Sequence, residues 1–172
     1  MPGATELSAD TMLNAVEAEL HTRKSEWVFL RELRVGTGRH KAALQRLDAF
    51  ALNCFPHLGM KRICYEVKLS RADFLCEMRQ PLKRCIGMRF SNEFYFVTPA
   101  GLLALTDLPV ECGLVEITPG GGCIIPVPAP WRDTPGPTWQ FAAAMLRNQR
   151  RATSVPAPNP QQQRFEFSAT AG

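Results

Sequence analysis

The chain has 172 residues, of which 45% are hydrophobic and 21% charged. These values are close to the averages for folded domains, and the length suits one globular domain. Its apolar runs are far shorter than the roughly 20 residues that a membrane-spanning helix needs. The first ten residues also lack the cationic flank and apolar core of a secretory signal. We therefore expect a single domain in the cytoplasm, with no membrane partner.

The positive charge is concentrated in one segment. The whole chain carries a net charge of +4, whereas residues 61–89 hold eight Lys and Arg against three Asp and Glu, a local charge of +5. Basic segments of this kind are typical of surfaces that bind nucleic acid. The six cysteines show no two-residue spacing of the kind found in zinc knuckles, so we expect buried free thiols in a reducing compartment.

Hydrophobic periodicity and turn residues predict a helix, three strands, a second helix, a fourth strand and a small hairpin. Pro81 should kink the second helix or split it in two. The expected elements are a helix over 8–22, strands over 27–35, 46–53 and 62–69, a helix from 70 to about 88, a strand over 93–98, and a hairpin of 113–118 with 123–127.

The C-terminal part differs in composition. A Pro-rich stretch over 126–137 precedes a predicted helix over 138–151, and the remainder is rich in Pro and Gln. This composition is typical of a flexible segment, which offers a site for a protein partner. We therefore divide the chain into a main domain over 1–128, a Pro-rich segment with a helix over 129–151, and a flexible tail over 152–172.

Three charged residues lie where strands should be apolar: Asp48 in the second strand, and Glu66 and Lys68 in the third. Side chains two apart on a strand project from the same face, so Glu66 and Lys68 point together, and Asp48 joins them if the two strands pair. Two carboxylates form an oxygen site suited to Mg²⁺ or Mn²⁺. An adjacent ammonium suits a phosphodiester, so this set predicts hydrolysis of a nucleic-acid backbone.

The order of Asp48 and Glu66-Val67-Lys68 resembles the signature of the PD-(D/E)XK, or restriction-endonuclease-like, nuclease superfamily, although Leu47 replaces its usual proline. The segments 66–74, 92–101 and 112–116 are similar to those of its MmcB-type DNA-repair proteins. The resemblance implies a fold of the α/β class with a mixed α+β sheet. It has a helix, three strands, a helix and a strand as its core, with a small C-terminal hairpin and helix.

The resemblance also implies a function and a site. Asp48, Glu66 and the carbonyl of Val67 would be metal ligands for Mg²⁺ or Mn²⁺, and Lys68 the catalytic lysine. The chain would then be a metal-dependent DNA endonuclease, a phosphodiester hydrolase of DNA repair or mobile-element metabolism. The alternative is a DNA-binding module on the same fold that is catalytically silent or depends on a partner. A homodimer would suit cleavage of both strands.

Many members of the superfamily add a glutamate from the first helix. Glu17 and Glu19 lie about equally far from that helix's apolar stripe, so periodicity does not choose between them. Glu32, an acid within the first strand, is a third candidate. These three alternatives stay open.

The expected nucleic-acid contacts are basic residues of the loop after the first strand and of the second helix, whose first turn Ser70 should cap. They are Arg39, Lys41, Arg71, Arg79, Lys83 and Arg84.

Overall fold

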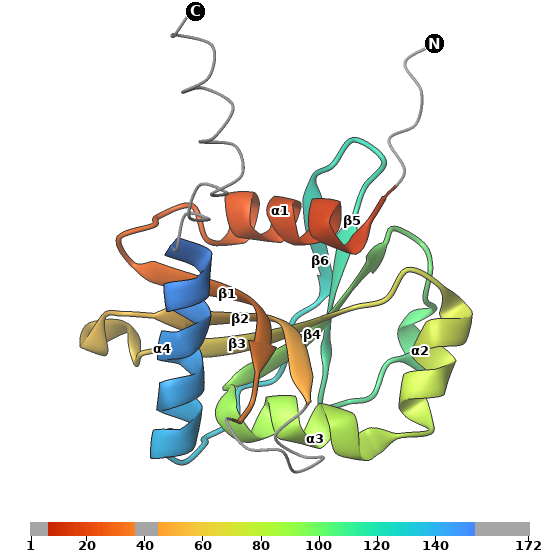
Figure 1. Ribbon diagram of the computed structural model, residues 1–172. Coiled ribbons are helices and arrows are strands. Elements are labelled where there is room, and N and C mark those ends of the chain that lie inside the picture. Colours follow the sequence, from red (N-terminus) through yellow and green to blue (C-terminus); the bar gives the residue numbers. More distant parts are fainter. Residues whose placement is uncertain (1–6, 37–44, 154–172) are drawn as a thin grey trace, which may run out of the picture.

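The computed structural model describes residues 7–36 and 45–153, which form a six-stranded mixed sheet with helices on both faces (Figure 1). The predicted mixed α+β class is therefore confirmed. The strands are β1 (Trp27–Arg34), β2 (Arg46–Asn53), β3 (Arg62–Val67), β4 (Glu93–Pro99), β5 (Gly113–Ile117) and β6 (Cys123–Val127). The helices are α1 (Ala9–Leu20), α2 (Arg71–Met78), α3 (Pro81–Phe90) and α4 (Trp139–Thr153), with short 3-10 turns at Pro56–Leu58 and Leu105–Asp107.

The strands lie in the sheet in their chain order, from β1 to β6. β1, β2 and β3 pair antiparallel, β3, β4 and β5 pair parallel, and β6 returns antiparallel to β5. The parallel pair β3–β4 needs a crossover, which α2 and α3 provide. These two helices therefore cover one face of the sheet, while α1 crosses the other (Figure 1).

The first helix begins at a capping box. Ser8 Oγ accepts the backbone N–H of Thr11 at 3.2 Å, and Thr11 Oγ1 accepts that of Ser8 at 2.8 Å. Each bond satisfies a donor that the helix itself cannot satisfy. Met12, Leu13 and Val16 form its buried stripe, close to the stripe that the periodicity predicts.

The expected second helix is two helices. Pro81 is the first residue of α3, and Gln80 lies between α2 and α3 in a non-helical conformation. Proline suits this first helical position because its missing N–H would have no partner there. The split lets α3 turn and run close to the sheet. A Cβ added at Gly87 would stand 2.9 Å from Cys64 Sγ, which shows how closely α3 approaches β3.

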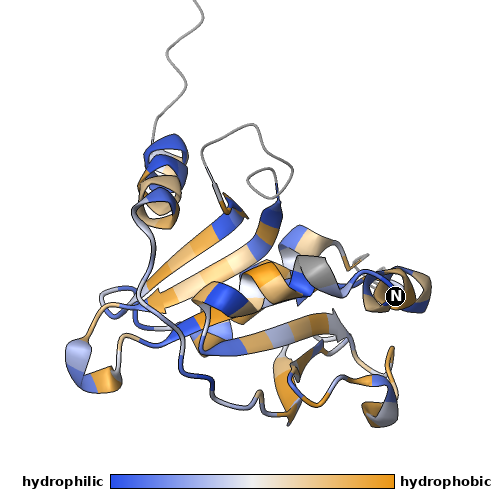
Figure 2. Cartoon of the chain, turned by 90° about the horizontal axis from the view of Figure 1, so that it is seen from below, coloured by the Kyte–Doolittle hydropathy of each residue, from blue (hydrophilic) through white to orange (hydrophobic). Residues whose placement is uncertain are grey.

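Apolar side chains pack on both faces of the sheet. Figure 2 shows that hydrophobic residues recur along the strands and helices that carry these side chains. One core joins the sheet to α1, and the other joins it to α2, α3 and α4. Phe141 of α4 lies deep in the second core, where its ring stacks on Phe90 at 4.1 Å and meets Phe50 edge-on. The C-terminal helix is therefore part of the main hydrophobic core.

The cysteines differ from the expectation in their burial. All six lie within the described residues and are free thiols, as predicted, but only Cys64 and Cys112 are buried. Cys123 is partly buried, and Cys54, Cys76 and Cys85 are exposed.

The last strand is an edge strand with a bulge. The pairs Leu114↔Val127 and Glu116↔Ile124 leave Val115 of β5 facing two residues of β6, Ile125 and Pro126. Proline has no N–H to donate to a ladder, so it is tolerated at such a bulge on the edge of a sheet.

A buried histidine makes the stability of the fold depend on pH. His21 is 3% exposed, and its Nε2 lies 2.9 Å from the hydroxyl of Tyr65. Burial, and then the positive charge of Lys61, lower the pKa of His21 from 6.5 to about 4. Between these two pH values the unfolded chain binds a proton at His21 that the folded chain does not bind, so protonation favours the unfolded state. The folded state is therefore most stable, with respect to this group, above pH 6.5, and it loses stability as the pH falls toward 4.

We therefore expect the free energy of unfolding to fall by about 3 kcal/mol across this window, beyond the contribution of the carboxylates. The measurement is urea unfolding of the wild type and His21→Gln at a series of pH values. The variant cannot gain this charge, so its stability should fall less. His57→Gln, at an exposed site, should keep the wild-type dependence. Equal pH dependence in His21→Gln and the wild type would contradict this role of His21.

Candidate functional site

Both ladders of β2 are interrupted at Asp48. The ladder between β2 and β3 ends at the pair Ala49↔Tyr65. The ladder between β1 and β2 has the pairs Arg31↔Ala49 and Leu33↔Leu47, but Glu32 and Asp48 between them are not paired. Glu32, opposite Asp48, has a φ of 54°, a left-handed conformation that is uncommon for a residue with a side chain. Beyond Ala49, β2 no longer pairs with β3.

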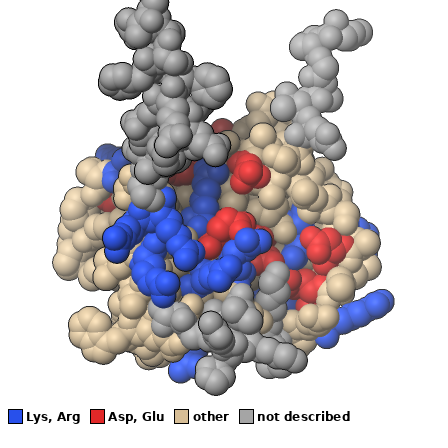
Figure 3. All heavy atoms as spheres, viewed as in Figure 1, with Lys and Arg blue, Asp and Glu red and all other residues tan. Residues whose placement is uncertain are grey.

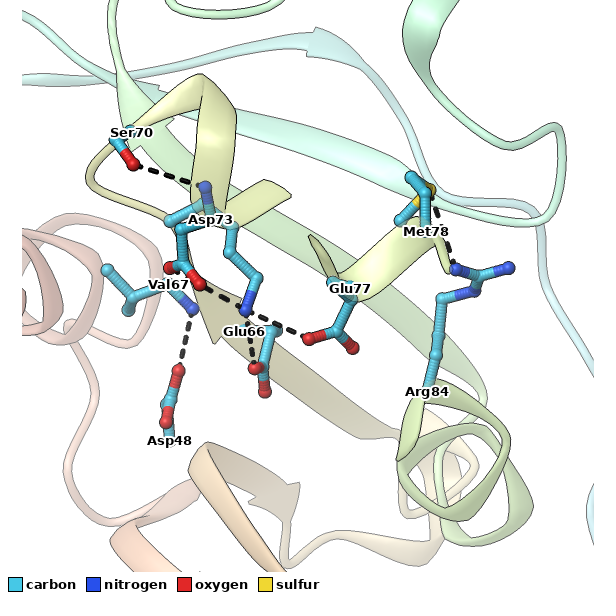
Figure 4. A network of polar contacts seen from close by, with 9 residues as sticks. Asp48, Glu66, Val67, Ser70, Asp73, Glu77, Met78 and Arg84 are labelled. Carbon is cyan, nitrogen blue, oxygen red and sulfur yellow. Dashed lines mark hydrogen bonds and ion pairs between the residues drawn. The ribbon is translucent and has the colours of Figure 1, made fainter. Parts of the chain in front are cut away.

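The side chain of Asp48 bridges the two strands at this point. Its Oδ2 accepts the backbone N–H of Val67 at 2.9 Å, so a carboxylate replaces the missing ladder bond. Asp48 therefore faces the end of β3, where Glu66 lies (Figure 4). The strand pairing that the sequence required for a joint site is confirmed by this contact.

Lys68 follows directly after β3. Its backbone N–H donates to the carbonyl of Val97 at 2.9 Å, which holds it against β4. Its ammonium lies between two carboxylates, 2.9 Å from Glu66 Oε1 and 2.9 Å from Glu77 Oε2. Asp73, at 3.9 Å, is a more distant and more exposed partner. The predicted convergence of Glu66 and Lys68 on one face is confirmed.

Glu77 is a member of this cluster that the sequence analysis did not identify. Ser70 caps α2 as predicted, accepting the N–H of Asp73 at 3.2 Å, and this fixes the start of the helix. Phe74 and Glu77, three residues apart on one face, are then its buried residues. The sequence feature that could have identified Glu77 is its spacing of three residues from Phe74, which places an acid on the apolar face of a short helix.

The cluster is a buried group of charges. The side chains of Glu66, Lys68 and Glu77 are only 3 to 5% exposed. Burial alone would lower the pKa of Lys68, but the charges and hydrogen bonds of Glu66 and Glu77 outweigh it and raise that pKa above its usual value. Lys68 is therefore a permanent cation.

A neighbouring thiol reports on the same negative potential. Burial raises the pKa of Cys64 well above its usual value, and the charges of Glu66, Asp48 and Glu77 raise it further. Since Coulomb interactions fall off with distance, all three carboxylates act on one point of the core. Glu66 and Glu77 contact Lys68, and Asp48 contacts the adjacent Val67, so residues of β2, β3 and α2 form one acidic centre.

The oxygen donors of the cluster decide whether a metal ion fits it. Across residues 7–36 and 45–153, no three His, Cys, Asp or Glu side chains stand together as a ready metal-binding group. Within the cluster, the ammonium of Lys68 lies between Glu66 and Glu77. A carboxylate has two oxygens and about four lone-pair sites, so a carboxylate that accepts a hydrogen bond, as Asp48 does from Val67, can also accept a cation. The chemistry of these oxygens suits Mg²⁺ or Mn²⁺.

The three candidates for an additional glutamate are each bound elsewhere. Glu17 pairs with Arg31 at 2.7 Å, and Glu19 Oε2 accepts the backbone N–H of Cys123 at 2.8 Å. Glu32 forms an ion pair with Arg46 and its side chain is half exposed. Among the described residues, the glutamate that joins Glu66 beside Lys68 is Glu77.

The six predicted nucleic-acid contacts differ in their exposure and in their partners. Arg39 and Lys41, and the side chain of Lys83, lie outside the described residues. Arg84 is 9% exposed and pairs with Glu111 at 3.0 Å, so it does not offer its charge to a ligand at the surface. Arg71 is exposed but is held by both carboxylate oxygens of Asp107. Arg79 is exposed.

The helices of the described residues are all too short or too polar to cross a bilayer.

Comparison with known proteins adds evidence on the fold. Protein-family models give no match to this chain, and a search of curated proteins gives none either. Among solved structures, the chain is similar to the SPO1766 protein of unknown function from Silicibacter pomeroyi. The TM-score is 0.62 and the sequence identity 17%, over 91% of this chain and 99% of that one. This likeness supports the overall architecture of the mixed sheet and its helices.

Proposed function

We propose that the chain is a metal-dependent nuclease that hydrolyses DNA phosphodiester bonds, acting in the cytoplasm in DNA repair or mobile-element metabolism. The observation that carries the proposal is the junction of β2 and β3. Both ladders of β2 are interrupted at Asp48, and the Asp48 carboxylate meets the end of the strand that supplies Glu66 and Lys68. The order of elements and the resemblance to PD-(D/E)XK nucleases support the same function.

In this proposal the acidic residues bind the metal ion and the lysine contacts the phosphate or the water. Asp48 and Glu66, with the carbonyl of Val67, would hold Mg²⁺ or Mn²⁺. When bound, such a metal polarises a phosphoryl oxygen and lowers the pKa of water. The raised pKa of Lys68 keeps its ammonium protonated, so this residue donates hydrogen bonds and positive charge instead of accepting a proton. Its natural role is to orient water or to neutralise charge that develops on the phosphate.

The decisive substitution is Asp48→Asn. Asparagine keeps an oxygen that can accept the N–H of Val67 but loses the negative charge, so we expect the fold to persist and cleavage to fall about a hundredfold or more. The measurement is cleavage of labelled single-stranded, duplex and branched DNA with Mg²⁺, Mn²⁺ or EDTA. Asp10→Asn, an exposed acid of α1, is the matched control and should cleave normally. Equal cleavage by Asp48→Asn and the wild type would disprove this site.

A second candidate function is a DNA-binding module without catalysis of its own. The two ion pairs of Lys68 favour this function, because an ammonium that bridges Glu66 and Glu77 can serve to stabilise the fold instead of taking part in catalysis. In that case the wild type should bind DNA in a salt-dependent manner and give no products with any metal. The same cleavage panel therefore separates the two functions.

A further inference from the structure

An apolar pocket of about 140 Å³ lies where β2, α3 and α4 meet. Three of its lining residues are phenylalanines that pack on one another: Phe90 stacks on Phe141, and Phe50 meets Phe141 edge-on. Pro135 and Pro137, from the segment before α4, also line it. An apolar cavity of about 150 Å³ is large enough to bind benzene. The pocket therefore has the size and the chemistry to hold one phenyl ring.

Exposed apolar surface adjoins this pocket. Met60 and Met145 line it, and Met60 is 43% exposed. Trp139, which begins α4 and lies in the chain between Pro137 and Phe141 of the lining, is 91% exposed. In Figure 3 the lower left of the molecule, where α4 begins, is largely uncharged, whereas Lys and Arg gather nearer the middle. Apolar surface of this kind is typical of a site that binds apolar side chains.

One cation also lines the pocket. Arg62 of β3 donates from Nε to Asn92 Oδ1 at 3.2 Å and from Nη2 to Thr134 Oγ1 at 2.8 Å. Both of these partners are neutral, and none of the ion pairs between described residues includes Arg62. A ligand with a carboxylate next to a phenyl ring would therefore match both the apolar lining and this guanidinium.

The chain itself carries such a combination of groups after α4. In Phe165-Glu166-Phe167 an acid stands between two phenyl rings, and it is the only acid after Asp133. The segment 165–167 begins about 12 residues after Thr153, the last residue of α4. A chain of this length spans up to about 40 Å when extended, whereas α4 measures about 18 Å from its end back to Phe141. The segment is therefore long enough to return along α4 to the pocket.

We propose that the segment 165–167 occupies this pocket, with one phenyl ring against the three phenylalanines and with Glu166 beside Arg62. A further ring extends the edge-on and stacked contacts that these phenylalanines already make. The short connection to α4 gives the segment an effective concentration in the millimolar range, which favours it over any separate peptide. The inference is independent of the proposed nuclease function, because no residue of the acidic centre lines the pocket.

The test is carbon-13 NMR of the full chain, labelled at the methyl groups of methionine. Met60 and Met145 line the pocket, whereas Met12 lies in the other core. An aromatic ring changes the resonance of a methyl group beside it, so Phe165→Ala/Phe167→Ala should shift the signals of the two pocket methionines and leave that of Met12. We expect the ratio of docked to undocked segment to fall about tenfold or more, because the ring contributes most of the buried apolar area.

The matched control is Gln162→Ala/Gln163→Ala, which changes two neighbouring residues that have no ring. Its methionine signals should equal those of the wild type, at low and at high protein concentration alike. Pocket signals that the loss of both phenyl rings leaves unchanged would overturn the proposal. So would a wild-type shift that appears only at high protein concentration, because the segment of a second copy would then occupy the pocket.

A second pair of variants tests the contact with Arg62. Glu166→Gln should lower the docked ratio about twofold to fivefold, as expected for one ion pair at the surface, and added salt should reduce this difference. Arg164→Gln removes the neighbouring charge of opposite sign and should not lower the docked ratio. Equal losses in Glu166→Gln and Arg164→Gln would contradict the pairing of Glu166 with Arg62.

Discussion

Replacing Lys68 with methionine should lower the free energy of unfolding by about 3 to 5 kcal/mol and abolish cleavage. The substitution leaves Glu66 and Glu77 buried without the cation that lies between them. Removing one partner of a buried ion pair costs this much because the remaining charge has lost its solvation and its counter-charge. Urea unfolding, with a check that the m-value is unchanged, measures the loss.

Two further variants show that the loss arises from the buried charges. Lys24→Met changes an exposed lysine and should alter stability by less than about 0.5 kcal/mol. The double variant Lys68→Met/Glu77→Gln removes one of the two carboxylates that contact Lys68 in the wild type, so it should be more stable than Lys68→Met alone. Lys68→Met as stable as the wild type would rule out the buried cluster described above.

Replacing Gly113 with alanine should destabilise the fold by about 3 kcal/mol. A Cβ at this position would stand 2.4 Å from Cε1 of Tyr95 and 2.6 Å from the backbone nitrogen of Ala129. The ring of Tyr95 is buried and stacks on Tyr65, and a backbone atom is fixed by the chain, so neither neighbour can move away easily. For a domain of this size the midpoint of thermal unfolding should fall by roughly 10 °C.

Gly136→Ala is the matched control for this substitution. No heavy atom lies within 4 Å of a Cβ at Gly136, and alanine there restricts the unfolded chain slightly. Its melting midpoint should therefore equal or slightly exceed that of the wild type. If Gly113→Ala had the same midpoint of thermal unfolding as the wild type, β5 would not pack against Tyr95 and Ala129 as described.

The sequence predicted the elements where the pattern of burial is periodic. The sequence pattern predicted strands such as β4 and β6, and Ser8 and Ser70 indicated where helices begin. Both kinds of feature depend on residues close together in the sequence. The ends were less accurate: β3 stops at Val67, two residues early, since the chain must turn to reach the cap at Ser70. Which option Pro81 takes, a kink or a split, depends on the packing of α3.

The part of the candidate site that the sequence predicted comes from neighbouring residues of one extended segment and from one strand beside it. Glu66 and Lys68 are two residues apart at the end of β3, so their convergence follows from the alternation of an extended chain, and Asp48 required only that β2 and β3 be neighbours. Glu77 comes from a helix whose burial depends on tertiary packing, and short helices give weak periodic signals. The burial of Arg84 and the packing of α4 against β1 likewise depend on contacts between distant segments, which no local pattern encodes.

The bulge and Pro126 of β6 determine how the sheet meets other chains. An exposed edge strand is a template for another strand, and Ile124 and Ile125 make this edge apolar enough to attract one. Proline removes a donor there, and the bulge twists the strand away from the regular repeat, so intermolecular strand addition at this edge is disfavoured. Two copies of the chain would therefore associate through another surface, without joining their sheets at β6.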